Sequence, residues 1–517
     1  MFLEDTFYYY KLTDYLIHQQ GFDIVFIDNR QTEVWLQRTK RKQNHVIRLT
    51  NQEFDWKNQL KIDVDRTYTN AKKLAKLFLG WNIELHNVYV AKHAPVDDWE
   101  SLNETKKINQ GKFTNMHVYY LNDENRSDEK ERLFQETSVE PIEFNLPRDV
   151  LDMERITQYL KVSILGEFQQ IQNTSTKIFE YAKPFYTYVL LVINVLMFLL
   201  LEWQGGSTST ETLIRYGAKY NPAILDGEWW RIVSSMFLHI GFLHLVMNMF
   251  ALHIVGSLVE RIYGVKRFLF IYFGSGILGG ITSFAFSPQL AAGASGAIFG
   301  LFGALLFFGL HYRRIFFQTM GWNIIVIIAF NIIFGFVVQQ IDNGAHIGGL
   351  VGGFIASGIA FFPKKKLIKQ QSMAIFGYII IITTLLIYGI LHTSTHYDPA
   401  LEVQIAQQLI VGEEYDEVIT VTTRIIKSNP SDYSAELLFL RSYAYSKLAQ
   451  TDKARKDLEN LISIEPNKIP EAHYNLALIY MDNDEANKAK KSLEKAIDLD
   501  STNKLFTDLY QDWFSNE

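Results

Sequence analysis

Two residues in the apolar middle of the chain could act together as a nucleophile and a base. Ser295 lies in Gly-Ala-Ser-Gly at 293–296, and His346 lies in Ala-His-Ile-Gly-Gly at 345–349. A serine hydroxyl becomes an effective nucleophile when a neighbouring imidazole accepts its proton during attack. The spans offer no acidic third member, but Phe299, one helical turn after Ser295, could hold the imidazole by stacking. Either residue alone would more often serve packing or structural hydrogen bonding, and their joint occurrence favours catalysis without a metal or cofactor.

A second pair of polar residues could stabilise the oxyanion that such an attack creates. His244 and Asn248 are four residues apart, so on a helix they present a ring N–H and an amide N–H on one face. The backbone N–H of Ser295, at a helix N-terminus, would add a third donor. We therefore expect His244, Asn248 and Ser295 to form the oxyanion hole.

These residues lie in a region whose apolar runs are long enough to cross a bilayer, which takes roughly 17–25 residues. A wholly soluble protein is excluded, and polar side chains inside such runs are functional candidates because their burial in hydrocarbon is costly. The seven expected spans are residues 185–203, 243–259, 268–286, 295–311, 322–338, 346–362 and 375–391.

Positive charge occupies alternate connections between these spans, and such connections face the cytoplasm. The basic residues are Lys177, Lys183, Arg261, Lys266, Arg267, Arg313, Arg314, Lys364, Lys365, Lys366 and Lys369. This pattern places the N-terminal part of the chain inside and its C-terminal part outside. It also places Ser295 and His346 at the outer ends of their spans, at the same depth.

Small residues on the two spans favour a close approach of their backbones. One span carries Gly296 and Gly300, and the other carries Gly349 and Gly353, each pair at a spacing of four. His346 shares the stripe of Gly349 and Gly353, so its imidazole should project from the face that packs.

In combination, these motifs resemble those of the rhomboid intramembrane serine proteases. The chain carries GxSG at 293–296, AHxxGxxxG at 345–353, HxxxN at 244–248 and the Trp-Arg loop motif in Glu228-Trp229-Trp230-Arg231. The resemblance covers about 185–365. The soluble N-terminal domain and the C-terminal repeats make the chain similar to a subgroup in Gram-positive bacteria.

The resemblance implies a Ser295 and His346 dyad, with the two polar residues of HxxxN completing the oxyanion hole. Phe299 stands where a tyrosine often packs on the histidine, so stacking is retained and the hydroxyl is lost. The Trp-Arg pair would brace a loop, and His239 would be structural. The family also implies a small residue before the scissile bond, in a substrate segment near the outer membrane face.

The first 180 residues predict a soluble mixed α/β domain. Its strands are expected at 22–27, 34–38, 45–49, 83–93 and 116–121, the first three antiparallel, and a helix is expected at 69–81. The domain also contains His18, His45, His86, His93 and His117 among many acidic residues. A divalent-metal site is one interpretation of these histidines. Because a tight spacing such as HxxxH is absent, ordinary solvated or hydrogen-bonded histidines are the simpler one.

The last 120 residues are helical and periodic. Three blocks recur at 35–36 residues, close to the 34 of the tetratricopeptide repeat. Within the blocks, residues twelve apart correspond at Val418 and Pro430, Ala454 and Pro466, and Ala489 and Ser501. Such units stack and leave a groove for an extended peptide or an envelope protein. An ordinary helical bundle is the alternative.

Composition narrows the class of protein further. The chain has 517 residues, a net charge of −6 and no cysteine. Without a basic stripe, nucleic-acid binding is not expected, and without cysteine, thiol nucleophiles and disulfide scaffolds are excluded. We expect a mainly α protein with a cytoplasmic α/β domain at 1–180, a seven-span rhomboid-like bundle at 181–395 and an extracytoplasmic repeat domain at 396–517.

The leading functional interpretation is an intramembrane serine endopeptidase of the bacterial plasma membrane. Its partners would be the lipid bilayer and membrane proteins whose transmembrane segments it cleaves near the outer face. One alternative is a catalytically weak or inactive rhomboid-like scaffold that presents membrane proteins to other machinery. A transporter or channel is disfavoured, because spans two to six carry almost no charged pathway residues apart from histidines.

Overall fold

The computed structural model describes residues 3–514 except 41–42, 76, 339–340, 364, 366 and 428–432. Among the residues used in the sequence analysis, Lys364, Lys366 and Pro430 lie outside the described residues. The chain divides into two compact units. One comprises Met1–Tyr181 with Phe308–Ile325, and the other comprises Ala182–Phe307 with Val326–Glu517.

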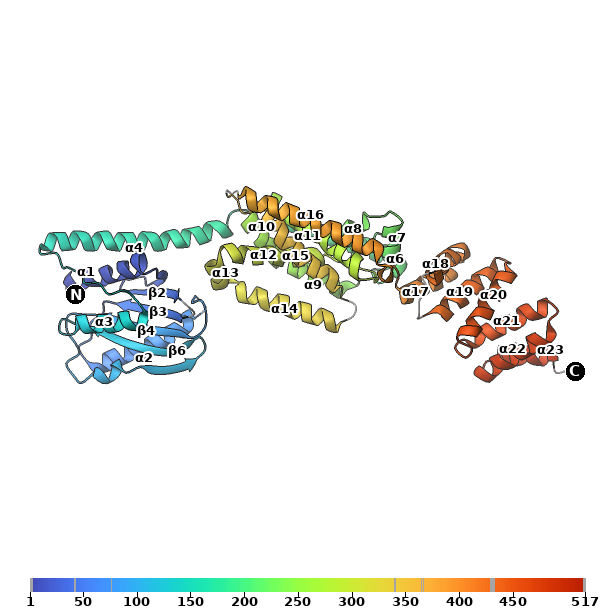
Figure 1. The fold of residues 1–517 in the computed structure, drawn as a ribbon, viewed down its shortest axis with the longest axis horizontal. Helices are drawn as coiled ribbons and strands as arrows, with labels where there is room; N and C mark the ends of the chain where they lie inside the picture. Colours follow the sequence, from blue (N-terminus) through green and yellow to red (C-terminus); the bar gives the residue numbers. More distant parts are fainter. Residues whose placement is uncertain are drawn as a thin grey trace. The chain divides into compact units, whose positions relative to one another are not determined.

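The first unit contains a six-stranded mixed sheet (Figure 1). Its strands are β1 Asp23–Ile27, β2 Glu33–Lys40, β3 Gln43–Thr50, β4 Ile83–Val90, β5 Lys106–Gln110 and β6 Phe113–Leu121, in the spatial order β1-β2-β3-β4-β6-β5. The predicted antiparallel arrangement of β1, β2 and β3 is confirmed. Strands β3, β4 and β6 are parallel, and β5 is an antiparallel edge strand.

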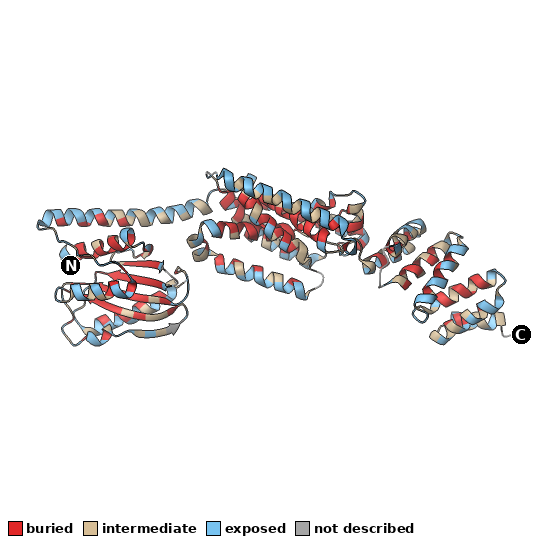
Figure 2. Ribbon diagram, viewed as in Figure 1, coloured by how far each residue is buried: buried red, intermediate tan, exposed pale blue. Residues whose placement is uncertain are grey.

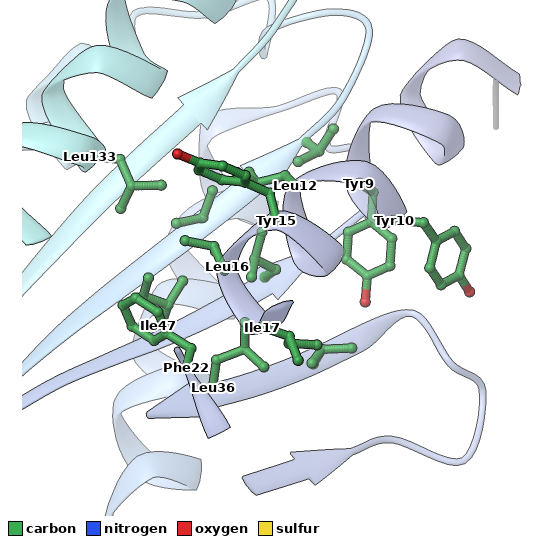
Figure 3. Close-up of a cluster of buried hydrophobic side chains, with 14 of the residues drawn as sticks. Tyr9, Tyr10, Leu12, Tyr15, Leu16, Ile17, Phe22, Leu36, Ile47 and Leu133 are labelled. Atoms are coloured by element: carbon green, nitrogen blue, oxygen red, sulfur yellow. The ribbon is translucent and has the colours of Figure 1, made fainter. Parts of the chain in front are cut away.

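Helices cover both faces of this sheet, because alternate residues of each strand point to opposite sides. On one face, Ile47 packs with Leu12 and Leu133 from α1 (Leu3–Asp14) and α3 (Arg126–Thr137) (Figure 3). The long helix α4 (Val150–Phe179) adds Leu160 and Ile164 to this core. On the other face, Val46 packs in a second core with residues of α2 (Lys57–Leu74).

The helix expected at 69–81 is misplaced in the prediction. Helix α2 begins at Lys57 and ends at Leu74, because its buried stripe starts at Leu60 and continues through Val64 and Ala71. Beyond it, the side-chain amide of Gln37 accepts from Leu79 N at 2.9 Å and donates to Leu79 O at 2.7 Å. These bonds hold Leu79 outside any helix.

In the second unit and the Phe308–Ile325 segment, every predicted span falls on a helix. These helices are α5 Tyr186–Gln204, α9 Phe242–Ala251 continuing into α10 Ser257–Tyr263, α11 Val265–Phe286, α12 Ser295–His311, α14 Gly321–Val337, α15 Asn343–Ala360 and α16 Ile368–Leu391. By length and apolarity, four helices among the described residues could cross a membrane, or five if the bent pair of α13 (Arg313–Thr319) and α14 is one span.

The helices differ in how far the protein buries them. Helix α12 has only 17 residues and is almost wholly buried, whereas α16 exposes large apolar side chains along its length (Figure 2). A helix enclosed by other helices need not match the full thickness of the hydrocarbon.

The carboxylate of Glu260 in α10 fixes the start of α5, accepting N–H bonds from Phe185, Tyr186 and Thr187 at 2.9–3.1 Å.

Short helices connect α5 to α9, and a helical array follows α16. The connecting helices are α6 Thr210–Arg215, α7 Asn221–Leu225 and α8 Arg231–Ser234. The array comprises α17 Pro399–Val411, α18 Tyr415–Lys427, α19 Ser434–Lys447, α20 Thr451–Ile464, α21 Pro470–Asp482, α22 Ala486–Leu499 and α23 Lys504–Phe514. Buried alanines such as Ala435, Ala454, Ala472 and Ala489 let successive helices pack closely.

Candidate active site

Ser295 and His346 are hydrogen-bonded to each other. The Ser295 hydroxyl lies 2.9 Å from His346 Nε2, and His346 is only 9% exposed. Ser295 is the first residue of α12 and His346 the fourth of α15, so the two helices meet at their N-terminal turns. The arrangement places a hydroxyl group in direct contact with an imidazole nitrogen that could accept its proton.

The contact depends on the glycines that line the crossing of α12 and α15. A Cβ built on Gly349 would lie 2.0 Å from the Gly296 carbonyl oxygen, and one built on Gly353 would lie 1.9 Å from that of Gly300. Real Cβ atoms essentially never come within 3.0 Å of a backbone atom. Any side chain at these positions would therefore push the two helices apart.

Phe299 packs flat on the imidazole of His346. The ring centroids are 4.1 Å apart and the planes differ by 12°. Nδ1 of His346 is buried and has no hydrogen-bond partner among the described residues. Stacking thus orients the ring where a triad would use a carboxylate, and an aromatic face also stabilises a cationic imidazolium.

His244 lies against the loop that precedes Ser295. A Cβ on Gly293 would be 2.8 Å from His244 Cε1 and 3.8 Å from Ser295 Oγ. Gly293 also has φ +149, a conformation that side-chain-bearing residues rarely adopt. Asn248 is buried one helical turn further along, and its amide donates to the His244 carbonyl at 3.1 Å. That bond uses one of its two N–H groups.

Two further residues brace the segments around Ser295 and His346. His239 is fully buried and accepts an N–H bond from Ala294 through Nε2 at 3.4 Å. Arg231 donates to the carbonyls of Ile214 and Ala218 and to the Glu228 carboxylate, so it joins α6 and the residues after it to α8. Its guanidinium lies 4.9 Å from the centre of the Trp230 ring.

The chain is similar in sequence to a known protein over most of its length. A family model described as the rhomboid domain matches 226–363, and one described as the tetratricopeptide repeat matches 435–468 and 470–503. The chain is 34% identical over 472 residues to rhomboid protease GluP of Bacillus subtilis (strain 168), with 91% of each chain covered. The chain belongs to the rhomboid family.

Shorter matches agree with this assignment. This rhomboid is 39% identical over 149 residues to putative rhomboid protease YdcA of Bacillus subtilis (strain 168), covering 28% of this chain and 75% of the relative. It is 38% identical over 151 residues to RHOMBOID-like protein 5 of Arabidopsis thaliana, covering 28% and 48%. The protein is a multi-pass membrane protein and a serine-type endopeptidase. The predicted resemblance to the rhomboid proteases is confirmed. The predicted tetratricopeptide repeats are also confirmed, in preference to the alternative of an ordinary helical bundle.

The helix that carries His346 is capped by Asp342, a role that was not predicted from the sequence. Asp342 precedes α15, and its Oδ1 accepts the Ala345 N–H at 2.9 Å. Ser283 of α11 donates to its other carboxylate oxygen. The run Asp-Asn-Gly before an apolar helix is an N-cap signal that could have identified it.

In the N-terminal domain, two of the five histidines considered for a metal lie close together, with an acidic residue beside them. The ligand atoms of His45, Glu84 and His86 all lie within 4.8 Å of one another. His45 Nδ1 is 3.0 Å from His86 Nε2 and 3.5 Å from the Glu84 carboxylate. His117 stacks on His86, whereas His18 contacts Asp14 elsewhere.

The electrostatics of this cluster suit a metal ligand set. Burial lowers the pKa of both His45 and His86, which keeps the imidazoles neutral, as metal ligation requires. Two imidazoles and a carboxylate are ligands that Zn²⁺ accepts. No sequence spacing revealed the cluster, because β3 and β4 bring the ligands together as parallel neighbours.

Proposed function

We propose that this rhomboid cleaves transmembrane segments with Ser295 as nucleophile and His346 as general base. The single observation that supports this assignment is the 2.9 Å contact between the two side chains at the N-terminal turns of α12 and α15. The alternative function is that of an inactive scaffold. A scaffold has no physical need for a serine hydroxyl aligned on an imidazole, or for a ring stacked on that imidazole to orient it.

The reaction proceeds by acyl transfer. Ser295 Oγ attacks the scissile carbonyl carbon while its proton passes to His346 Nε2, and the carbonyl electrons move to the oxygen. His346 then gives the proton to the leaving amine as the C–N bond breaks. A water molecule, deprotonated by His346, then attacks the acyl carbon; the ester bond to Ser295 breaks, the product leaves as a carboxylic acid, and His346 returns the proton to Ser295 Oγ.

The oxyanion is stabilised by the His244 ring, the Asn248 amide and the backbone N–H of Ser295. The position of His244 beside Gly293 supports its role. The Asn248 amide has a second N–H in addition to the one that bonds the His244 carbonyl, and this second N–H could donate to the oxyanion. The first backbone N–H groups of α12 have no partner within their own helix, which makes that helix start suitable for negative charge.

We further propose a seven-span topology in the bacterial plasma membrane. The domain at 1–180 is cytoplasmic, the protease domain spans 181–395, and the repeats at 396–517 are extracytoplasmic. The loop into α12 and the chain after α16 lie at one end of the bundle, where Asn221 bonds to the carbonyls of Ser287 and Thr395. This supports placing the repeats on the side of the dyad, where they would bind an envelope protein or peptide.

The test is cleavage of a single-span substrate in liposomes. Wild-type protein should cleave the segment near its outer end, with a small residue before the scissile bond, and Ser295→Ala should not. Residual cleavage by Ser295→Ala at more than about a thousandth of the wild-type rate, with contaminating proteases excluded, would exclude Ser295 as the nucleophile.

A further inference from the structure

The first helix of the repeat array is joined to the protease domain by a buried hydrogen bond. The Tyr220 hydroxyl, just before α7, donates to the Glu402 carboxylate of α17 at 2.6 Å. Tyr220 is 8% exposed and Glu402 is 1% exposed. Because the bond is buried, removing one partner leaves the other polar group without a compensating interaction.

Tyr220 is adjacent to a residue that holds the segment leading to the nucleophile. Lys219 exchanges two backbone hydrogen bonds with Ala291, at 2.8 and 3.1 Å. The buried Lys219 ammonium also donates to the carbonyls of Ser287 and Gln289, at 2.6 and 3.0 Å. Ala291 is four residues before Ser295. The side chain and the backbone of Lys219 therefore hold most of the segment 287–291, which leads to Ser295.

Asn221, on the other side of Tyr220, extends the same contact. Its amide donates to Ser287 O at 3.0 Å and to Thr395 O, just before α17, at 2.6 Å. At the rim, Arg424 of α18 lies 3.1 Å from Asp226, but both side chains are partly exposed and such pairs stabilise little. Of these two side-chain pairs with the repeat helices, the buried Tyr220–Glu402 bond is therefore the stronger polar anchor.

We propose that α17 contributes to the geometry of the active site. Its Glu402 and the bonded Tyr220 are positioning residues, which hold residues 287–294 in place before Ser295. This inference rests on the proposed function of Ser295. A continuous series of bonds connects α17 to this segment. Glu402 is hydrogen-bonded to Tyr220, Tyr220 follows Lys219 in the chain, and Lys219 is hydrogen-bonded to Ala291. Movement of α17 on the repeat side would therefore alter the geometry of the active site.

The experiment compares Tyr220→Phe, Glu402→Ala and the double variant in the full-length protein in liposomes. Each single variant should lower kcat about threefold to tenfold with little change in KM, because a displacement well below 1 Å is enough to slow an aligned reaction. The double variant should be no slower than either single one. Glu402→Gln retains an oxygen acceptor for Tyr220 and should restore kcat.

Asp457→Ala is the matched control. Asp457 of α20 is a buried carboxylate of the same array, and it bonds Arg441 of α19 at 2.7 Å, within the array. Its loss should loosen the repeats and leave kcat unchanged. A fall in kcat equal to that of Glu402→Ala would overturn the proposal, since general loosening of the repeats would then suffice.

Amide hydrogen exchange over 287–294 provides a readout that does not need activity. Exchange there should quicken in Tyr220→Phe and Glu402→Ala, and stay at the wild-type rate in Asp457→Ala. Wild-type kcat together with wild-type exchange in both variants would overturn the positioning role. If the wild-type protein showed no Ser295-dependent cleavage, the proposed function would fail, and the exchange rates alone would still decide whether α17 holds the segment.

Discussion

Substituting one glycine at the helix crossing should separate the nucleophile from its base. A Cβ on Gly349 would lie 2.0 Å from the Gly296 carbonyl oxygen, and contacts below 3.0 Å are essentially never seen. In Gly349→Ala, α12 and α15 must therefore move apart by about 1 Å. The same movement lengthens the 2.9 Å contact between Ser295 and His346. A misplacement of this size can cost about 100-fold in rate, so we expect kcat to fall by that factor with little change in KM.

The assay is turnover of a single-span fluorogenic substrate in liposomes, with the thermal midpoint measured on the same preparations. Overpacking of this kind costs about 1–3 kcal/mol, so the variant should melt earlier but still fold. Gly377→Ala is the matched control, because nothing lies within 4 Å of a Cβ at that position of α16. If folded Gly349→Ala kept more than half of the wild-type kcat, the close crossing would not be what aligns the dyad.

Four further predictions concern the oxyanion hole, the repeats, the histidine cluster and the topology. Asn248→Ala should lower kcat about 10²–10³-fold with substrate affinity little changed, and wild-type turnover would place the hole elsewhere. Burial raises the pKa of Glu402 to about 7 from 4.5, so the folded protein holds this proton more tightly than the unfolded chain. The thermal midpoint should then fall as pH rises from 4.5 to 7 and level off above 7. Glu402→Gln should lack this part of the dependence, and an unchanged profile would contradict the pKa. Full-length protein should bind Zn²⁺ by calorimetry and lose that binding in His86→Ala, whereas equal binding by both would exclude the cluster. With single cysteines introduced at the exposed Ser101 and Ser463, an impermeant maleimide on whole cells should label only the latter, and labelling of the former alone would invert the topology.

The contact between Ser295 and His346 could be predicted from the sequence because local rules fix its geometry. The apolar runs and the loop charges predict that Ser295 and His346 lie at the same depth, and glycines at a spacing of four permit the close helix crossing that brings them into contact. The stacking of Phe299 follows from its position one turn after Ser295. These relations involve neighbours on a helix or the start of a span, which sequence spacing describes directly.

Other features depend on contacts that spacing does not encode. The helix predicted at 69–81 was misplaced because Gln37 of a distant strand holds Leu79 outside a helix. Lys219 carried no motif, since its partners are backbone carbonyls about 70 residues away. The cluster of His45 and His86 depends on the order of the parallel strands. Long-range pairing therefore limited the sequence analysis more than local structure did.

The most direct test of the central claim is covalent labelling with a fluorophosphonate probe, read by peptide mass spectrometry. Wild-type protein in liposomes should carry one probe on the peptide containing Ser295. Ser295→Ala should carry none there, and His346→Ala should react far more slowly because the hydroxyl loses its base. Labelling of a different serine together with retained cleavage by Ser295→Ala, or rapid labelling of Ser295 in His346→Ala, would contradict the account.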